Sequence, residues 1–469
     1  MTLLNVLALF PGDVISLVGA GGKTSAALRL MDELAQAGHH AVFTTTTKIL
    51  EPMPRPGECL ILAETLDEAR AVLADPPCAK PFLACRRLEE ADADFAARAP
   101  YPARPNKLAG PPPEWIDTLN AERPDVTFLV EADGARHRLL KAPANYEPVL
   151  PAATTLLAPM ADLAVLGHPL SDEHVHRAGL AAQLLGAPPA TPLTPERVAR
   201  LLAHPEGGLK GAPETARITP LLTWWQDAPL PAAARETADH LAAQAGIERV
   251  LVADLRADEA VRYATRPSPV AAVVLAAGAS TRMGRPKQLL PWGPQNQPML
   301  RHVVQTTLAA GLEEVIVVLG HAAEQITPAL DGLPVRIVVN PAWADGLSSS
   351  VRAGLDAISP EAQAALFLLA DQPRLTPRVV AALVARFRRT RAAIVVPAAA
   401  ERRGAPALFA RALFGELRAV HGDRGGRALI ARHAGEVVAI PIADATLLAD
   451  MDTPDDLLTF DHRRPPCTD

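Results

Sequence analysis

A segment at residues 274–291 combines the residue types that bind a nucleoside triphosphate. Gly278 and Gly284 let the backbone pass close to phosphate oxygens, with its N–H groups directed at them. Arg282 can hold phosphates through its planar guanidinium, and Lys287 adds a point charge. Glycines could also serve an ordinary tight turn, but this combination is rare in such turns. The spacing therefore predicts a phosphate-binding turn.

Two aspartates later in the chain are candidate metal ligands for the same site. Asp371 directly follows the apolar run 366–370, at the expected carboxyl end of a strand, where open α/β sheets bind ligands. Asp452 lies in the motif Asp-Met-Asp-Thr-Pro near the chain end, which taken alone could equally begin a helix. Carboxylates in these places could hold Mg²⁺ beside a triphosphate.

Residues 274–291, with Leu-Ala-Ala-Gly and then Arg-Met-Gly-x-Pro-Lys, resemble the signature of the MobA-like nucleotidyltransferases, and most of all that of the molybdenum cofactor cytidylyltransferases. The resemblance implies Mg²⁺ bound by Asp371 and Asp452, and catalytic roles for Arg282, Lys287 and Asp371. CTP rather than GTP is implied chiefly by Ala277. The residues implied to bind the nucleotide are Leu275, Ala276, Ala277, Gly278, Gly284 and Gly320.

Two further polar loops resemble the substrate-binding segments of that family. In the first, 340–350, Ser348 and Ser350 open an expected helix whose N–H groups could hold a phosphate. In the second, 422–427, Arg424 and Arg427 lie among glycines and are implied to meet the phosphate of the pterin. Arg-Gly-Ala-Pro at residues 403–406 departs from the family's usual Gly-His-Pro, which leaves the details of the pterin pocket open.

The first half of the chain has its own glycine loop, Gly-Ala-Gly-Gly-Lys-Thr-Ser at residues 19–25, between an expected strand and helix. Lys23 could bind a β-phosphate and Thr24 could place its hydroxyl on Mg²⁺. A full Walker A pattern needs glycine where Leu17 stands, so the loop is a variant, or else a plain strand-to-helix turn. The residues predicted to bind nucleotide here are Gly19, Gly21, Gly22, Lys23 and Thr24.

Two carboxylates, Glu131 and Asp133, follow the expected strand 127–130, where Glu131 could hold a metal beside the Lys23 loop. The alternative is a turn that only shapes the chain. At residues 44–48, four threonine hydroxyls and the ammonium of Lys48 lie at the carboxyl end of another expected strand. His174 and His176 lack a third ligand, so no metal site is expected there.

These segments, together with Lys-Ala-Pro at 141–143, Glu-Pro at 147–148 and His-Val-His-Arg at 174–177, resemble the YqeC-like family over roughly residues 5–260. That family is described as an accessory factor for selenium-dependent molybdenum hydroxylases. The resemblance implies a nucleotide-binding accessory role, with ATP or GTP as the nucleotide, and says little about chemistry.

The elements that must position these residues alternate between strand and helix in both halves. In the second half, strands are expected at 270–275, 314–319, 335–340, 365–369 and 393–396, and helices at 299–310 and 349–358. In the first half, helices are expected at 26–37 and 225–240. We predict two α/β domains: a P-loop-like domain at 1–265, a linker at 266–269, and a Rossmann-like nucleotidyltransferase domain with a mostly parallel sheet at 270–469.

Composition limits the classes of partner. The net charge of −6 argues against broad nucleic-acid binding, and no stretch approaches the length of a membrane span. The absence of a cleavable leader predicts a cytoplasmic protein. Cys59, Cys78, Cys85 and Cys467 show no paired spacing, so reduced structural thiols are expected.

The combined expectation is a cytidylyltransferase that transfers CMP to molybdopterin, fused to a nucleotide-binding accessory domain. The expected recipient of the finished cofactor is a molybdenum hydroxylase of the xanthine dehydrogenase type. Two alternatives stay open: transfer with another base or to another phosphate acceptor, because this fold serves many acceptors, and a nucleotide-gated chaperone that delivers the cofactor.

Overall fold

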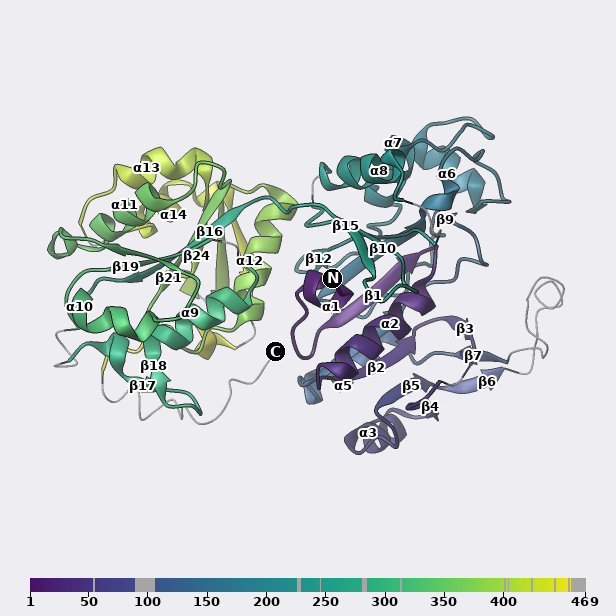
Figure 1. The fold of residues 1–469 in the computed structure, drawn as a ribbon, viewed down its shortest axis with the longest axis horizontal. Coiled ribbons are helices and arrows are strands. Elements are labelled where there is room, and N and C mark those ends of the chain that lie inside the picture. The colour runs from purple at the N-terminus through teal and green to yellow at the C-terminus, as the bar shows by residue number, and fades with distance from the viewer. Residues whose placement is uncertain are drawn as a thin grey trace. The chain divides into compact units, whose positions relative to one another are not determined.

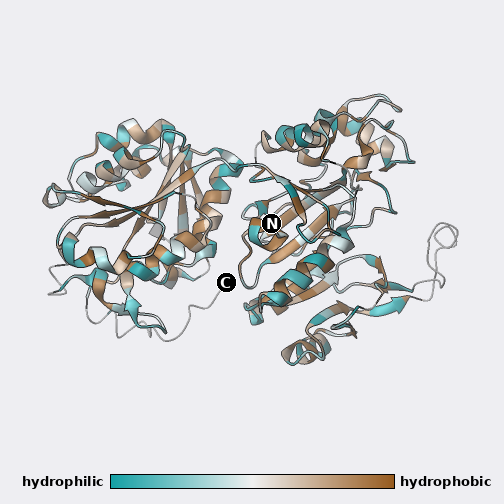
Figure 2. Ribbon diagram, in the orientation of Figure 1, coloured by the Kyte–Doolittle hydropathy of each residue, from teal (hydrophilic) through white to brown (hydrophobic). Residues whose placement is uncertain are grey.

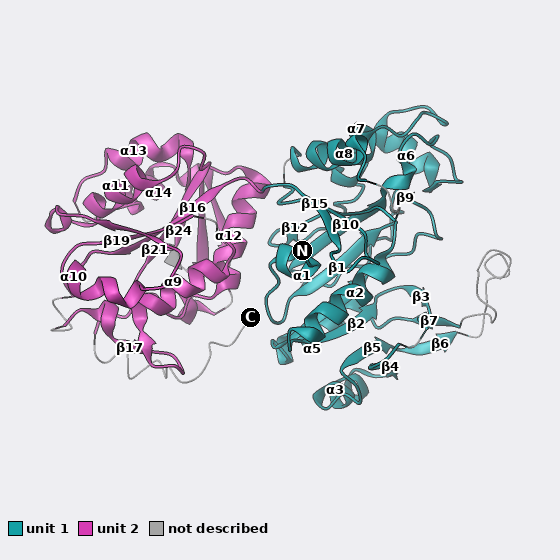
Figure 3. Ribbon diagram, in the orientation of Figure 1, with its two compact units in different colours: residues 1–266 teal, residues 267–469 magenta. Residues whose placement is uncertain are grey.

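The computed structural model of the chain describes residues 1–53, 55–88, 106–225, 229–244, 246–280, 285–312, 314–399, 402–403, 405–422, 425–442, 444–453 and 456. The chain forms two compact units, residues 1–266 and 267–469 (Figure 3). Each unit is an α/β domain with its own sheet (Figure 1). Among the described residues, no helix is both long and apolar enough to span a bilayer.

The first unit is built on a sheet with ten strands among its described residues, in the order β15-β14-β13-β10-β1-β8-β2-β5-β4, with β12 paired to β10. Neighbouring strands run parallel except β14 and β15. The strands are β1 (Val14–Gly19), β2 (His40–Thr45), β4 (Glu58–Leu62), β5 (Lys80–Ala84), β8 (Val126–Glu131), β10 (Leu156–Asp162), β12 (Arg217–Ile218), β13 (Leu221–Thr223), β14 (Leu251–Ala253) and β15 (Val261–Ala264).

Helices cover both faces of this sheet because successive residues of its central strands alternate between two apolar cores. In β1, Ile15 and Leu17 pack with α1 and α2 on one face, and Val14 and Val18 pack with the remaining helices on the other. Figure 2 shows these strands as the hydrophobic interior of the unit. The helices are α1 (Leu3–Leu7), α2 (Lys23–Gln36), α3 (Leu66–Ala74), α5 (Pro113–Glu122), α6 (Ala178–Leu185), α7 (Pro195–Ala203) and α8 (Ala232–Ala242).

Two small sheets accompany the large one. The strands β3 (Lys48–Leu50), β7 (Lys107–Ala109) and β6 (Arg86–Leu88) form an antiparallel sheet. The strands β9 (Leu140–Lys141) and β11 (Val175–His176) pair in parallel. This pairing brings the two short motifs at 141–143 and 174–177 next to each other.

The second unit has eight sheet strands among its described residues, in the order β20-β19-β16-β21-β24-β22-β23, with β25 paired to β22. Pairing is parallel from β20 to β21 and again between β22 and β25, whereas β24 runs antiparallel to both of its neighbours. The strands are β16 (Val270–Ala276), β19 (Glu314–Leu319), β20 (Arg336–Val339), β21 (Ala364–Leu369), β22 (Ile394–Ala399), β23 (Arg402–Arg403), β24 (Ala407–Ala410) and β25 (Val437–Pro441).

The central strands of this sheet are apolar throughout because both faces are covered. Alternate residues of β16 and β21 enter a core with α9 (Met299–Ala309) and α12 (Pro377–Thr390) on one face. The intervening residues pack with α11 (Leu347–Ala357), α13 (Phe414–Arg418) and α14 (Arg427–Arg432) on the other. The predicted fold class, two α/β domains with mostly parallel sheets, is confirmed.

One strand was not expected, and one expected helix is shorter. The strands expected at 365–369 and 393–396 are β21 and β22, and the unexpected strand β24 lies between them and pairs with both. The helix expected at 225–240 begins only at Ala232, after the cap residue Pro231, and residues 224 and 225 continue from β13 without helical structure.

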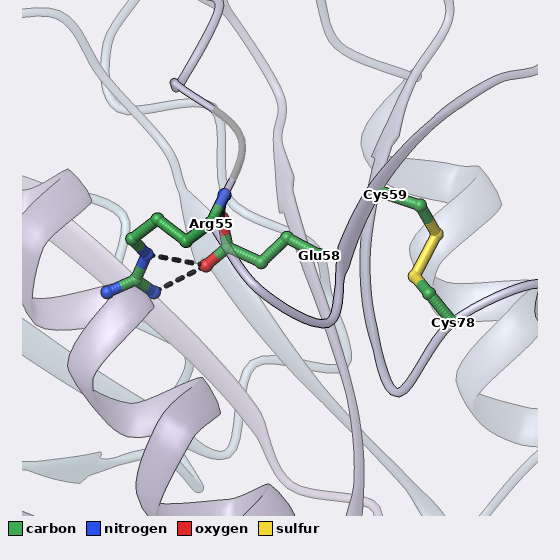
Figure 4. Close-up of a disulfide and its surroundings, with 4 residues drawn as sticks. All are labelled: Arg55, Glu58, Cys59 and Cys78. Atoms are coloured by element: carbon green, nitrogen blue, oxygen red, sulfur yellow. Dashed lines mark hydrogen bonds and ion pairs between the residues drawn. A yellow bond between two sulfur atoms is a disulfide. The ribbon is translucent and has the colours of Figure 1, made fainter.

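The expectation of reduced thiols is also wrong for two of the four cysteines. Cys59 on β4 and Cys78 before β5 form a disulfide, shown in Figure 4 beside the ion pair of Arg55 and Glu58. The parallel register of β4 and β5 sets Glu58 opposite Lys80, which brings the two cysteines within a Cα separation of 6.0 Å. Cys85 is free, and Cys467 lies outside the described residues.

Candidate functional site

In the second unit, the turn after β16 opens onto a cavity of about 340 Å³. The predicted residues that line it are Leu275, Ala276, Ala277, Gly278, Lys287, Ser350 and Asp371. They come from the carboxyl ends of β16 and β21, from the turn around Lys287 and from α11. Because these neighbouring strands are parallel, their carboxyl ends meet at one edge of the sheet, which is the usual ligand site of such folds.

Gln288, which the sequence analysis did not single out, holds this turn in place. Its buried amide donates to the carbonyl oxygens of Ala276 and Gly278 at 2.9 and 3.0 Å. The hydroxyl of Ser280 accepts the backbone N–H of Lys287 at 3.1 Å. Arg282 and Gly284 fall within the one gap of this segment and lie outside the described residues.

Gly320, at the end of β19, supports the turn from the side. A Cβ atom placed there would lie 2.6 Å from the Cβ of Trp343 and 2.8 Å from that of Ala277. Only glycine lets Trp343 and Ala277 pack this closely against residue 320. Trp343 is one of the residues that line the cavity.

The ammonium of Lys287 lies between the carboxylates of Asp371 and Asp452. It donates to Asp371 Oδ2 and, at 3.1 Å, to Asp452 Oδ1. Burial alone would lower the pKa of Lys287, but the charges and hydrogen bonds of the two aspartates outweigh it and raise that pKa. Sequence reasoning placed both aspartates near the turn, and the structure brings them to one ammonium.

A short apolar cluster fixes the backbone next to Asp452. Met451 is fully buried against Leu290, Trp292 and Met299, and its N–H donates to the carbonyl oxygen of Asp371 at 2.8 Å. Although residues 371 and 452 are distant in sequence, their backbones are thus joined directly.

A third carboxylate, Asp450, lies beside the pair. It accepts a hydrogen bond from the amide of Gln372 at 2.9 Å. Burial, and then the negative charge of Asp371, raise the pKa of Asp450. Across the described residues, no group of three or more His, Cys, Asp or Glu side chains is arranged to hold a metal by itself. A cation here would take further ligands from water or from a substrate.

The serines expected to open α11 are buried at its first turn. Asn340 donates to the hydroxyls of Ser349 and Ser350 at 2.8 and 3.0 Å. The hydroxyl of Ser348 is buried without a hydrogen-bond partner among the described residues. Of these serines, only Ser350 lines the cavity. Arg427 is exposed at the first residue of α14, and Arg424 lies outside the described residues.

In the first unit, the loop after β1 is shaped by glycines that the surrounding backbone requires. Gly19, Gly21 and Gly22 have φ angles of 91°, 85° and 102°. A Cβ at Gly21 would lie 2.3 Å from the backbone nitrogen of Asp162, and one at Gly22 would lie 2.7 Å from the indole of Trp225. The loop is therefore enclosed by β10 and by the residues after β13.

Lys23, the first residue of α2, points back across this loop. Its ammonium donates to the carbonyl oxygen of Gly19 at 2.6 Å and lies 3.2 Å from Asp133 and 3.8 Å from Glu131. Burial alone would lower the pKa of Lys23, but the charges of Asp133 and Glu131 outweigh it and raise the pKa. The structure thus brings together the predicted lysine and both carboxylates that follow β8.

Glu131 and Thr24 face each other across the loop. The threonine hydroxyl donates to the glutamate at 2.8 Å. Burial raises the pKa of Glu131, while the charge of Lys23 and the hydrogen bond from Thr24 act against that rise. A hydroxyl and a carboxylate side by side next to a phosphate loop are the pair that holds Mg²⁺ in P-loop proteins.

Further charged residues contact the carboxylates around Lys23. Lys141 on β9 lies 2.8 Å from both Asp133 and Glu147, and Arg177 donates to Glu147 at 2.6 Å. Beside them, burial and the charges of Arg177 and Lys141 lower the pKa of His176 from 6.5 to about 4. The short motifs that carried the resemblance at 141–148 and 174–177 are therefore parts of one network.

The fold and these two sites define a two-domain α/β protein whose second domain is of the nucleotidyltransferase type. Residues 272–437 match the family described as the MobA-like NTP transferase domain, and residues 15–179 match the YqeC protein family.

Individual relatives are each similar to this chain over less than half of its length. The chain is 32% identical over 205 residues to the YqeC protein of Escherichia coli (strain K12), which covers 44% of this chain and 73% of that protein. It is 34% identical over 191 residues to the nicotine blue oxidoreductase of Paenarthrobacter nicotinovorans, covering 39% of this chain and 92% of that one. A similar solved structure is Rv0371c from Mycobacterium tuberculosis H37Rv, with 31% identity, 41% and 97% coverage and a TM-score of 0.37. The chain belongs to the YqeC family through its first unit and to the MobA-like NTP transferases through its second.

Proposed function

We propose that the second unit is a cytidylyltransferase that transfers CMP from CTP to the terminal phosphate of molybdenum-bound molybdopterin, giving the dinucleotide cofactor and pyrophosphate. The observation that carries the proposal is the contact of Lys287 with Asp371 and Asp452 beside the cavity under the turn after β16. A cation and two carboxylates that meet beside the carboxyl ends of the parallel strands β16 and β21 suit a nucleotide with its metal.

The reaction needs no nucleophile from the protein. An oxygen of the acceptor phosphate attacks the α-phosphorus of CTP in line, and the bond from that phosphorus to the departing pyrophosphate breaks. The chain contributes position and charge. The backbone of Leu275–Gly278 is held rigid by Gln288 to receive the triphosphate, while Arg282 and Lys287 offset negative charge on the leaving pyrophosphate.

Asp371 and Asp452 are the residues that would hold Mg²⁺. Two observations fit this role: a cationic group already lies between their oxygens, and Asp371 Oδ1 is buried without a hydrogen-bond partner among the described residues. When bound, Mg²⁺ supplies neutralisation of the phosphate oxygens. Two carboxylates with phosphate oxygens and water are a usual ligand set for this ion.

The acceptor would bind through the loops around α11 and α14. Ser350 lines the cavity and Ser348 keeps a buried hydroxyl without a partner among the described residues. Arg424 and Arg427 would meet the anionic pterin phosphate. The choice of CTP rests on the family resemblance at Ala277, and the finished cofactor would pass to a hydroxylase of the xanthine dehydrogenase type.

For the first unit we propose binding of ATP or GTP at Gly19–Thr24, with Mg²⁺ between Thr24 and Glu131. Binding of this nucleotide would support cofactor insertion into the hydroxylase. Nucleotide should raise the unfolding temperature of the wild-type chain, since a ligand stabilises the state that it binds. Lys23→Met should abolish that rise. The control is Lys210→Met, which removes an ammonium that lies 3.8 Å from Glu206 and should keep the rise.

The decisive experiment supplies the purified full chain with molybdenum-bound molybdopterin and with each nucleoside triphosphate in turn, and follows pyrophosphate. Pyrophosphate release with molybdopterin and CTP, but not with the other triphosphates, supports the proposal. Preference for GTP removes the cytidylyl assignment. A parallel reaction replaces molybdopterin with a sugar phosphate or an isoprenoid-precursor phosphate, and release only there changes the acceptor. If Asp371→Ala leaves hydroxylase maturation unchanged, the second unit is a chaperone that delivers the cofactor.

A second candidate comes from the name of the Paenarthrobacter relative, an oxidoreductase that is matched over 92% of its length. The same preparation should be tested for oxidation or reduction of nicotine blue. Turnover there, without pyrophosphate release from any triphosphate, would favour the oxidoreductase.

A further inference from the structure

One ammonium serves several carboxylates at the cavity of the second unit. Lys287 contacts Asp371 and Asp452, and Asp450, which accepts a hydrogen bond from Gln372 at 2.9 Å, adds a third carboxylate. Among the described side chains of this cluster, negative groups therefore outnumber positive ones. The side chains of Lys287 and Asp371 are only 18% and 16% exposed, so solvent screens their contact poorly, whereas the side chain of Asp452 is 47% exposed.

The backbones that carry the two aspartates do not depend on the lysine. Asp371 lies two residues after β21, whose residues pair with β16 along its length. The residue before Asp452, Met451, is buried in its own apolar cluster and bonded to the Asp371 carbonyl. The two carboxylates would thus stay close together if the ammonium left.

The backbone of Lys287 is equally anchored, but its side chain can move. Its N–H donates to Ser280, and Gln288 bonds back to the strand end. Lys287 and Asp371 both line the cavity, so a rotation of the four-carbon side chain can turn the ammonium from the aspartates toward a ligand there.

Asp371 retains unused binding capacity. Its Oδ1 is buried without a hydrogen-bond partner among the described residues, although its Oδ2 accepts from Lys287. A buried carboxylate oxygen that lacks a partner is costly and marks a place where a cation or donor belongs.

We propose that Lys287 is an exchangeable counter-ion, which occupies the place between Asp371 and Asp452 in the metal-free chain and transfers to the triphosphate when a divalent cation takes that place. The proposal rests on the proposed function only in that metal and nucleotide share this cavity. Lys287 is then a positioning residue for the metal as well as a ligand of the phosphates.

The exchange has a thermodynamic consequence. A divalent cation that binds alone must displace the ammonium and leave it without an anionic partner. When a triphosphate is present, the displaced ammonium gains phosphate oxygens, so metal and nucleotide should each tighten the binding of the other by the same factor.

The test is a titration of the full chain with Mn²⁺, followed by the electron paramagnetic resonance of the free ion, with and without nucleotide. Lys287→Met removes the competing charge and should tighten Mn²⁺ binding without nucleotide by at least about fivefold. Lys287→Arg keeps the charge and should bind like the wild type. Arg418→Met removes a positive charge whose partner, Asp356, lies 3.1 Å away on the exposed side of α11, and should also leave the affinity unchanged. Asp371→Asn gives the background from metal bound elsewhere.

In the wild type, at least one of CTP, GTP, ATP and UTP should raise Mn²⁺ affinity, and Lys287→Met should reduce that rise. Equal or weaker metal binding by Lys287→Met, or no loss of binding in Asp371→Asn, overturns the proposal. If Lys287→Met does not fold, the wild-type titration decides: failure of every nucleotide to tighten Mn²⁺ binding contradicts it. The metal titrations involve no pterin, so exchange without pyrophosphate release would refute the proposed function alone.

Discussion

The carboxylate of Asp133 lies 3.2 Å from the ammonium of Lys23, and the same carboxylate lies 2.8 Å from Lys141 and accepts the N–H of Gly19 at 3.0 Å. Lys23 and Lys141 are only 5% and 2% exposed. Two buried ammoniums thus share one carboxylate at the loop where a phosphate is expected, and each also has a second partner, Glu131 for Lys23 and Glu147 for Lys141. The first unit thus places one of its own carboxylates at the glycine loop, and the second unit places one of its own ammoniums between two carboxylates.

Asp133→Asn should destabilise the first unit strongly. The substitution keeps the size of the side chain but removes the carboxylate that both buried ammoniums share, which leaves Lys23 with Glu131 and Lys141 with Glu147 and costs about 3 kcal/mol. Urea unfolding followed by circular dichroism measures the change. The control is Asp67→Asn, whose side chain is 89% exposed beside Arg70 and should cost less than about 1 kcal/mol. A loss at Asp133 no larger than at Asp67 would show that the buried pairs contribute nothing.

Gly21→Ala should be worse than Gly38→Ala, although both glycines have positive φ, at 85° and 77°. The two substitutions share the strain of about 1 kcal/mol for a side chain in this conformation. Only at Gly21 would the new Cβ meet backbone, 2.3 Å from the nitrogen of Asp162, whereas nothing lies within 4 Å at Gly38. Overpacking should add about 1–3 kcal/mol to the Gly21 variant, measured by urea unfolding. Equal losses would mean that the loop can move away from β10.

Strands buried on both faces were predictable from sequence because they read as continuous apolar runs. The strand expected at 314–319 is β19 with the same bounds, and Asp371 was recognised because a carboxylate follows such a run. The glycine loops were also recognisable from a short stretch of sequence, because several glycines followed by a lysine are rare in ordinary turns.

The contacts that complete both sites were not predictable, because they join residues distant in sequence. Asp452 reaches Lys287 only through the packing of Met451, and Trp225 covers Gly22 only because β13 lies beside β10. The insertion of β24 beside β21 depends on strand register, which no local pattern encodes. The pairing of Cys59 with Cys78 likewise follows from the register of β4 and β5.

Reduction of the disulfide should weaken the first unit. Cys59 and Cys78 are 19 residues apart, and closing a loop of that length stabilises a fold by about 3 kcal/mol in the chain-entropy account. Cys59→Ser should therefore lower the urea midpoint of the oxidised protein, and dithiothreitol should lower the wild type to the same value. Cys85→Ser, at a free cysteine, should leave the response to dithiothreitol intact. A wild type indifferent to dithiothreitol would contradict the disulfide's contribution.

His176 should make the first unit sensitive to mild acid. Burial, and then the charges of Arg177 and Lys141, lower its pKa from 6.5 to about 4 in the folded chain, against the partial opposition of Glu147. Between these two values the unfolded chain binds a proton that the folded chain does not, so stability falls as pH decreases from 6.5 to 4.

Urea unfolding at a series of pH values should show this through His176→Gln, which has no such proton to bind. The difference in unfolding free energy, wild type minus variant, should stay constant above pH 7 and fall steadily below pH 6.5, toward its lowest value near pH 4. A difference that does not change with pH would show that His176 takes up no proton on unfolding.

Asp371→Asn should abolish most of the proposed nucleotidyl transfer without unfolding the second unit. The side chain is nearly isosteric, and the backbone bond from Met451 to the Asp371 carbonyl is unaffected. Loss of a charge preorganised for the transition state should lower kcat by about a hundredfold or more, with a smaller change in the KM for the triphosphate. The rate is measured as pyrophosphate release at saturating Mg²⁺. Asp356→Asn, 67% exposed on α11 beside Arg418, is the matched control and should retain full activity. A loss below about tenfold at Asp371 would remove this residue from the transfer step and leave Asp452 or Asp450 as the carboxylate that matters.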